Sequence, residues 1–415
     1  MRSKSCPLEI AINFGPRLEY TSSHSIDEQV LHAMDVFRSV LWRIKSLSLT
    51  VPNRALAYTA LHRCQDDAPI LENLNIHVYH SMQDDGYSKA LLLIFNGCTP
   101  KLLSCSLTSF NFGWDPRSMT GLRVLKLGGY FNSFAPPRAT LLGILRQCPE
   151  LEELALRNMS DVDTNSCQVA VIEDDVPVTC KIHLPQLKRA SFYYSGLGHT
   201  TEIMNQVSFS NLESLELAYL ENVDQLLQAL YAQALTRLPL KRLRIETCLF
   251  TEMKFVNLLR KLPSLVTLQL VDVEDMSYVT LKVWTPTVLH PNSELTGFFF
   301  QALSCHQPWS CPRLEYLTLD GCTSFDWDSL RVFVESRLPA DSQMYRRYHT
   351  NVASLVSSAS AAAADYARMK SRNTGQTALL TAPQRIRMID VTRCSQISRE
   401  MVQWLRMYVG SVKCE

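Results

Sequence analysis

Metal binding is the first chemistry to consider, because histidine and cysteine recur along this 415-residue chain. His77 and His80 lie three residues apart in a strand-like segment, so their side chains point to opposite faces and do not readily chelate one ion. A second group, close in sequence, consists of Cys305, His306, Cys311 and Cys322. It lacks a Cys-x-x-Cys pair, and its last two cysteines hold positions in a regular repeat. We therefore expect no metal and no cofactor.

The sequence supports phosphate binding and nucleophilic catalysis no better than it supports metal binding. Gly128-Gly129, and likewise Gly196 and Gly198, lack the strand–glycine–helix context of a phosphate-binding loop, so they indicate turns or strand ends. No serine, histidine and acid set carries a recognisable signature, although such sets form in space and cannot be seen without a fold. The sequence therefore predicts that the protein is not an enzyme.

The most regular feature is a repeated apolar phrase, leucine-x-x-leucine-x-leucine, which recurs about every 20 to 36 residues over most of the chain. Its fourth and sixth positions alternate with polar residues, which is the pattern of a short strand with one buried face. One such strand cannot bury that face alone, whereas stacked copies share a continuous core. The seven clearest copies begin at Leu71, Leu122, Leu151, Leu212, Leu240, Leu265 and Leu314, and four weaker ones begin at Ile44, Leu102, Leu187 and Ile386.

Segments with helical spacing lie between the strand-like copies. Examples are Leu141, Leu142 and Leu145, and the segment from Leu226 to Tyr231. These helices should cover the outer face of the strand ladder. We therefore predict an α/β fold, a right-handed leucine-rich-repeat solenoid shaped as a horseshoe, with parallel β-strands on the concave face and helices on the convex face.

Cysteine marks two recurrent positions in the repeat. Cys248, Cys322 and Cys394 occupy the ninth position, where the chain turns inward and a small, weakly polar residue can pack and meet backbone groups. Cys148-Pro149 and Cys311-Pro312 stand shortly before the first leucine. Together these marks resemble the cysteine-containing leucine-rich repeats of F-box proteins, over roughly residues 40–335 and the last 30 residues.

A narrower resemblance is to fungal F-box proteins. It rests on Cys6-Pro7-Leu8-Glu9-Ile10, on residues 42–49 and on Cys311-Pro312-Arg313-Leu314. The resemblance implies that the repeats hold a target protein, while the F-box tethers it to the adaptor and cullin subunits of a ubiquitin ligase. No leucine-proline-x-glutamate phrase precedes Cys6, so the F-box is expected to be missing from this sequence.

Two functions follow from that resemblance. The first is the substrate-recognition part of an F-box-type ubiquitin ligase, in ubiquitin-dependent protein degradation. The second is a stand-alone scaffold or decoy with no ligase link. Fold and partner are nearly independent in such repeats, so the sequence does not name the target.

The chain is expected to have four parts. Residues 1–40 form an N-terminal capping segment with a helix from Asp27 to Leu41, and residues 41–339 form the solenoid. Residues 340–384 form a low-complexity insertion, expected to be disordered, because a stretch rich in serine and alanine cannot build a packed core. Residues 385–415 form a terminal repeat and a capping helix.

Composition limits the cellular location and the classes of partner that we expect. The net charge of +1 argues against a general binder of nucleic acid or anionic membranes, because such binding requires concentrated lysine and arginine. No apolar run approaches the length of a membrane span, and residues 1–14 lack the apolar core of a secretory signal. The 13 cysteines lack paired short spacings, which favours reduced thiols and a cytoplasmic or nuclear location.

The repeat offers a surface for binding a protein. Positions three, five and seven of each copy face the concave side, opposite the buried positions. Arginine and tyrosine recur there, and protein interfaces are enriched in both types, although a single such residue is more often part of a solvated strand face. We predict that the partner-binding residues are Arg157, Arg189, Tyr193, Arg242 and Arg244.

Overall fold

The computed structural model describes residues 6–14, 23–79, 94–114, 119–131, 135–159, 181–273, 297–305, 309–338 and 383–414. The chain divides into two compact units. The first comprises residues 1–240 and 247–249, and the second comprises residues 241–246 and 250–415. In the described residues the main sheet has thirteen strands, eight in the first unit and five in the second, and within each unit neighbouring strands are parallel.

The first unit is built on parallel strands that follow one another in chain order. These strands are β1 (Leu8–Asn13), β2 (Ile44–Val51), β3 (Asn73–Val78), β4 (Ser104–Thr108), β5 (Val124–Tyr130), β6 (Glu153–Met159), β8 (Arg189–Tyr193) and β10 (Ser214–Ala218). A separate pair of short parallel strands consists of β7 (Ile182–His183) and β9 (Val207–Ser208).

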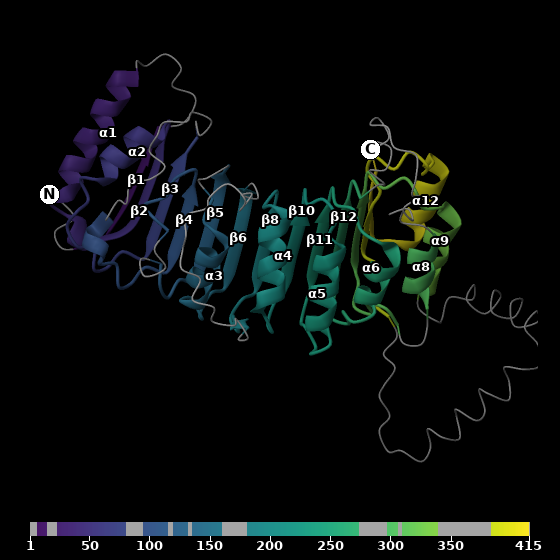
Figure 1. Cartoon of the computed structure of the whole chain (residues 1–415). Helices are drawn as coiled ribbons and strands as arrows, with labels where there is room; N and C mark the ends of the chain where they lie inside the picture. The colour runs from purple at the N-terminus through teal and green to yellow at the C-terminus, as the bar shows by residue number, and fades with distance from the viewer. Residues whose placement is uncertain are drawn as a thin grey trace, which may run out of the picture. The chain divides into compact units, whose positions relative to one another are not determined.

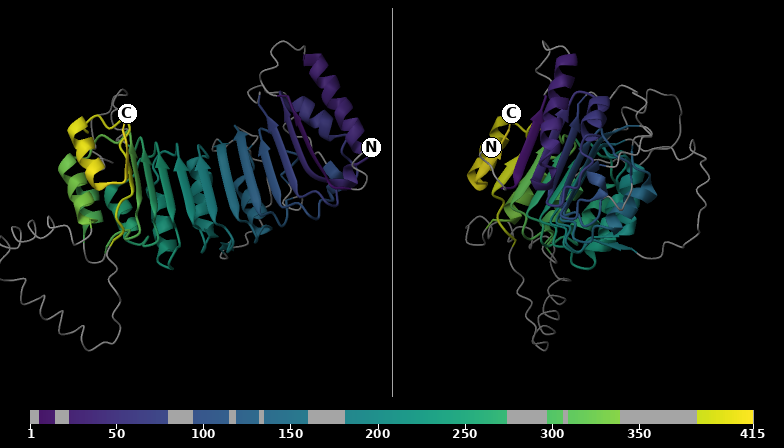
Figure 2. Two further views of the ribbon diagram at one scale, coloured as in Figure 1. Left: turned by 180° about the vertical axis from the view of Figure 1, so that it is seen from behind. Right: turned by 90° about the vertical axis from the view of Figure 1, so that its left-hand side faces the viewer.

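The first unit also contains helices. They are α1 (Ser23–Arg38), α2 (Arg54–Leu61), α3 (Arg138–Arg146), α4 (Leu197–Gln206) and α5 (Asp224–Ala234), with 3-10 turns at Leu41–Arg43 and Ile94–Gly97. Figure 1 shows α3, α4 and α5 on one face of this unit's sheet, and the view from behind in Figure 2 shows the other face of those strands. Among the described residues of this unit, α3, α4 and α5 therefore cover the same face of the sheet.

The second unit repeats this plan. Its parallel strands are β11 (Arg242–Glu246), β12 (Thr267–Val271), β13 (Tyr316–Asp320), β14 (Met388–Asp390) and β15 (Ser411–Lys413). Its helices are α6 (Glu252–Leu259), α8 (Gly297–Ser304), α9 (Trp327–Ser336) and α12 (Arg399–Tyr408). Helix α12 begins after Ser398, whose Oγ accepts a hydrogen bond from the backbone N–H of Met401 at 3.4 Å.

The repeated apolar phrase accounts for this architecture. In the copy that forms β10, Leu212, Leu215 and Leu217 are all fully buried. The register pairs Leu215 with Ala190 and Leu217 with Phe192, so the same positions stack from strand to strand. All eleven predicted copies supply a strand of the sheet. The prediction of an α/β fold with parallel strands is confirmed, and the strand–helix alternation is consistent with a solenoid-like fold.

The ninth-position cysteines pack as expected. The thiol of Cys394 donates to the carbonyl oxygen of Leu319 at 2.9 Å. Cys248 and Cys322 donate in the same way, at 3.7 Å, to the sixth-position carbonyls of Leu217 and Leu270. Each thiol therefore bonds to the sixth position of an earlier copy, which explains why a small, weakly polar residue fits here.

Each end of the array carries a strand that the sequence analysis above does not predict. The helix predicted for Asp27–Leu41 spans Ser23–Arg38 and packs against α2. The strand β1, which was not predicted, pairs with β2 and buries Ile10 and Ile12. Likewise β15 follows α12 and pairs with β14. The backbone of an added strand pairs with N–H and C=O groups that would otherwise be unpaired at the sheet edge, which a helix cannot do.

Some predictions fall outside the described residues. The low-complexity insertion at 340–384 is one of them, except for residues 383 and 384, and the positions of His80 and His306 are others. Across the parts of the chain that the structure describes, no helix combines the length and the apolar character that crossing a membrane requires.

Candidate protein-interaction surface

Three of the five predicted residues lie together on neighbouring strands of the first unit. In the register of β6 and β8, Arg189 pairs with Glu153 and Tyr193 pairs with Arg157. Their side chains share a face with those of the flanking strands, because alternate residues of a strand point to the same side. We call this the polar face, and it consists of Lys126, Glu153, Arg157, Arg189, Ser191, Tyr193 and Glu216.

Glu153 anchors one half of the polar face. Its Oε1 lies 2.7 Å from Lys126 Nζ, and its Oε2 accepts a hydrogen bond from Arg189 Nη2 at 2.6 Å. Partial burial alone would raise the pKa of Glu153, but the hydrogen bonds and charges of Lys126 and Arg189 outweigh it, so this pKa is lowered. The carboxylate therefore stays ionised and holds two cations from two neighbouring strands.

Glu216 anchors the other half. Ser191 Oγ donates to Glu216 Oε2 at 2.6 Å, and Arg157 Nη2 lies 3.6 Å from the same oxygen. Arg157 also donates to Ser191 Oγ at 3.4 Å. The Arg157 side chain remains 57% exposed, so its ion pair contributes at most about 1 kcal/mol and can be exchanged for a partner's acceptor.

Tyrosine rings adjoin this charged network. Tyr193 is half-buried, and its ring centroid lies 5.0 Å from that of Tyr219, with the planes inclined at 60°. Tyr194 and Tyr219 are 52% and 39% exposed. The repeat pattern does not single out Tyr194 or Tyr219, because each holds the eighth position of its copy, beyond the strand.

The eighth position has a shared backbone conformation that the sequence did not reveal. In nine consecutive copies the backbone at this position is left-handed, with φ between 47° and 71°. Only two of the nine are glycine, although other residues adopt this region at a cost of about 1–3 kcal/mol. The nine residues are Ser109, Gly129, Asn158, Tyr194, Tyr219, Thr247, Asp272, Gly321 and Arg393.

The other two predicted residues belong to the second unit. Arg242 and Arg244 both lie on β11. Arg242 Nη2 donates to Gln269 Oε1 at 3.1 Å, and Arg244 Nε donates to Glu246 Oε2 at 3.0 Å. The structure therefore brings Arg157, Arg189 and Tyr193 into one surface of the first unit and places Arg242 and Arg244 together in the second.

Another charged cluster in the second unit involves Arg393. Its Nη1 lies 2.8 Å from Asp272 Oδ1, and its Nε lies 2.8 Å from Asp320 Oδ1. A Cβ added to Gly321 would lie 2.1 Å from Asp272 Oδ1, so glycine leaves room for this contact. Arg393 therefore links three repeats of the second unit.

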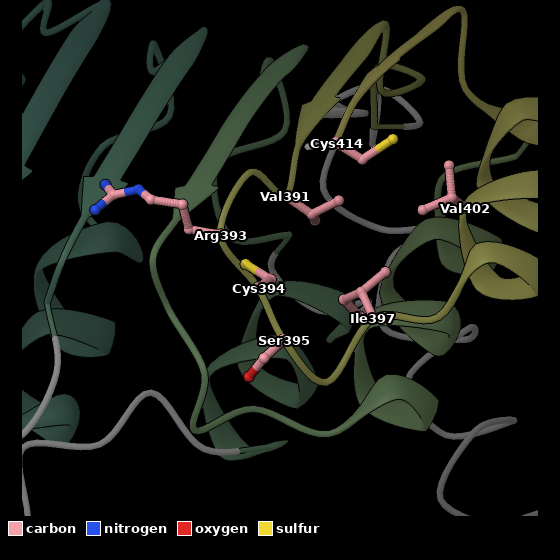
Figure 3. A pocket seen from close by; sticks show the side chains of 7 residues that line it. All are labelled: Val391, Arg393, Cys394, Ser395, Ile397, Val402 and Cys414. Atoms are coloured by element: carbon pink, nitrogen blue, oxygen red, sulfur yellow. The ribbon is translucent and has the colours of Figure 1, made fainter.

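A hollow of about 280 Å³ lies next to that cluster. Figure 3 shows Val391, Ile397, Val402 and Cys414 around it, whereas the Arg393 side chain extends away from them, in agreement with its ion pairs. The other residues that line this hollow are Cys394 and Ser395.

The cysteine cluster considered for zinc is described only in part, because His306 lies outside the described residues. Cys311 is buried and donates to the carbonyl of Leu259 at 3.2 Å, whereas Cys305 is exposed. Burial raises the pKa of the Cys311 thiol to about 12, which opposes the thiolate that a metal requires. Within the same parts of the chain, no three histidine, cysteine or acidic residues are grouped so that they could hold a metal ion.

The fold and this surface define an α/β, solenoid-like repeat protein with a parallel sheet and one polar sheet face. Comparison with known proteins does not narrow this class: no family model matches the chain, and no curated protein matches it.

Proposed function

We propose that the protein is a leucine-rich-repeat module that binds another protein through the polar face. In this proposal the repeats form a right-handed horseshoe with the strands on its concave side. The observation that carries it is the position of Arg157, Arg189 and Tyr193 on adjacent strands of a hydrogen-bonded sheet. Arginine and tyrosine dominate the energetics of many protein interfaces. The strands hold these side chains in place before binding, which lowers the entropy cost of association.

The resemblance to fungal F-box proteins extends this proposal. We infer that the bound protein is a substrate of a cullin-type ubiquitin ligase, with the adaptor and cullin subunits as further partners in the cytoplasm or nucleus. The alternative is a stand-alone scaffold or decoy. Affinity capture of the product of the native locus separates the two, because the ligase function requires cullin and adaptor subunits in the eluate and the scaffold function requires their absence.

Affinity capture with a surface variant tests protein binding itself. The variant carries Arg157→Ala, Arg189→Ala and Tyr193→Ala. A matched control removes the same residue types from helices or helix ends and carries Arg146→Ala, Tyr231→Ala and Arg260→Ala. Truncating an interface hot spot costs at least about 2 kcal/mol, or roughly 30-fold in affinity. We expect the surface variant to lose a specific set of proteins that the control retains. Equal recovery of every protein by both variants would overturn the proposal.

A further inference from the structure

A pocket of about 290 Å³ lies at the carboxyl ends of β6, β8 and β10 in the first unit. Its lining includes Tyr194 and Tyr219, and Tyr219 also packs against Tyr193 of the polar face. The pocket is therefore continuous with the surface proposed to bind a protein.

The pocket combines three kinds of wall. Met159 and Leu220 are 1% and 2% exposed and contribute apolar surface. Tyr194 and Tyr219 contribute exposed aromatic rings. Glu221 is exposed and contributes a carboxylate, which forms no ion pair with another residue in the described ranges of the chain. The lining thus offers apolar, aromatic and anionic groups together.

The backbone holds these tyrosines in an unusual conformation. Tyr194 has φ of 48° and Tyr219 has φ of 54°, a region that bulky residues rarely adopt. The Tyr194 N–H donates to the Ala218 carbonyl at 2.8 Å, and the Met159 N–H donates to the Tyr194 carbonyl at 2.8 Å. The eighth positions of all nine copies share this conformation, so the repeat itself fixes where the two tyrosine side chains leave the backbone.

We propose that this pocket receives a lysine or arginine side chain of the bound protein. The alkyl stem would pack on Met159 and Leu220, as long basic side chains do on apolar surfaces. The cation would meet the tyrosine rings and the Glu221 carboxylate. This inference rests on the proposed function and specifies one residue type in the partner.

The charges at the pocket favour a cation over an anion. Helix α4 begins at Leu197, which also lines the pocket, and a helix N-terminus carries about half a positive charge. Glu221 carries a full negative charge, which exceeds that contribution. An acidic or phosphorylated side chain would be repelled by Glu221, and a wholly apolar side chain would remove the carboxylate from water without a partner.

Selection from a library of random nonapeptides, with the full-length chain as bait, tests this inference. We expect lysine or arginine to be enriched at one fixed position. Replacing that residue by norleucine should weaken binding of the selected peptide at least tenfold, and so should Tyr219→Ala or Glu221→Gln. The control Glu150→Gln removes an exposed carboxylate outside the pocket and should leave affinity unchanged. With the norleucine peptide as ligand, Glu221→Gln should cost little further affinity. Each of the two changes removes the same contact, between the cation and the carboxylate.

The outcomes distinguish this inference from the proposed function. Selection of peptides without a basic residue, unchanged affinity of the Glu221→Gln variant, or failure to select any peptide would each overturn the basic-residue pocket. Protein binding through the polar face is judged separately by a variant with Arg157→Ala and Arg189→Ala alone, because Tyr193 contacts Tyr219 of the pocket.

Discussion

Arg337 offers a direct test of how the second unit is held together. It is 2% exposed, and its guanidinium donates to the carbonyls of Leu303, Ser310 and Cys311 at 3.3, 2.8 and 3.0 Å. The guanidinium carbon also lies 5.0 Å from the centroid of the Phe333 ring. Burial lowers the pKa of Arg337 to about 10, so it remains charged near neutral pH. One side chain thus ties α9 to the end of α8 and to the turn before β13.

The Arg337→Met variant should be markedly less stable. Each buried carbonyl that loses its donor costs about 1–3 kcal/mol. Removing the guanidinium also removes its own desolvation penalty, which offsets part of this loss. We therefore expect the free energy of unfolding to fall by about 3 kcal/mol. Urea denaturation followed by tryptophan fluorescence measures the change, and hydrogen exchange in residues 297–305 and 309–314 should localise it to the second unit.

Two controls make the Arg337 result interpretable. Arg313 lies nearby in sequence and is exposed, so Arg313→Met should change stability by no more than about 0.5 kcal/mol. The Arg337→Lys variant should be intermediate, because an ammonium group cannot reproduce the planar fork that reaches three carbonyls. If Arg337→Met proves as stable as Arg313→Met, the guanidinium does not hold these segments and the reasoning fails.

Two further predictions concern the first unit and the buried thiols. At Gly129 (φ 71°) an added Cβ would lie 2.2 Å from Ser109 Oγ, whereas at Gly121 (φ 68°) it would meet nothing within 4 Å. In thermal unfolding, Gly129→Ala should be more destabilising than Gly121→Ala by about 1–3 kcal/mol. Equal losses of stability would show that crowding against Ser109 is not the cause. Burial raises the pKa of the Cys105 and Cys311 thiols from 9.0 to about 12, so the folded state keeps protons that the unfolded chain loses. The free energy of unfolding should therefore fall as pH rises above 9, by about 1 kcal/mol per thiol at pH 10. Urea titrations at several pH values measure this dependence, and alanine in place of Cys105 or Cys311 should weaken it.

The strand positions could be predicted because each copy carries its own burial pattern. Leu215 and Leu217 alternate with polar residues, and that alternation alone places them inside. The strand β1 carries the same signal in Leu8, Ile10 and Ile12, but without a preceding apolar position it does not match the phrase. The left-handed eighth position has no such signal, since tyrosine, threonine and arginine occupy it as well as glycine.

The candidate surface was predictable only in part. Side chains in a strand alternate between its two faces, and this alternation places Arg157, Arg189 and Tyr193 on one face of their strands. Their partners depend on the register between segments far apart in sequence, so the pairing of Arg189 with Glu153 could not be read from spacing. The aromatic pocket was missed for the same reason, because Tyr219 lies beyond its strand and meets Tyr193 only once β8 and β10 are aligned.

Site-specific photocrosslinking tests the central claim of protein binding most directly. A photoreactive phenylalanine analogue replaces Tyr193 on the polar face in one variant and Tyr231 on helix α5 in another, and both are irradiated in native cells. Binding through the polar face predicts a reproducible protein adduct from position 193 that position 231 does not give. The same adducts from both positions, or an adduct from position 231 alone, would contradict it.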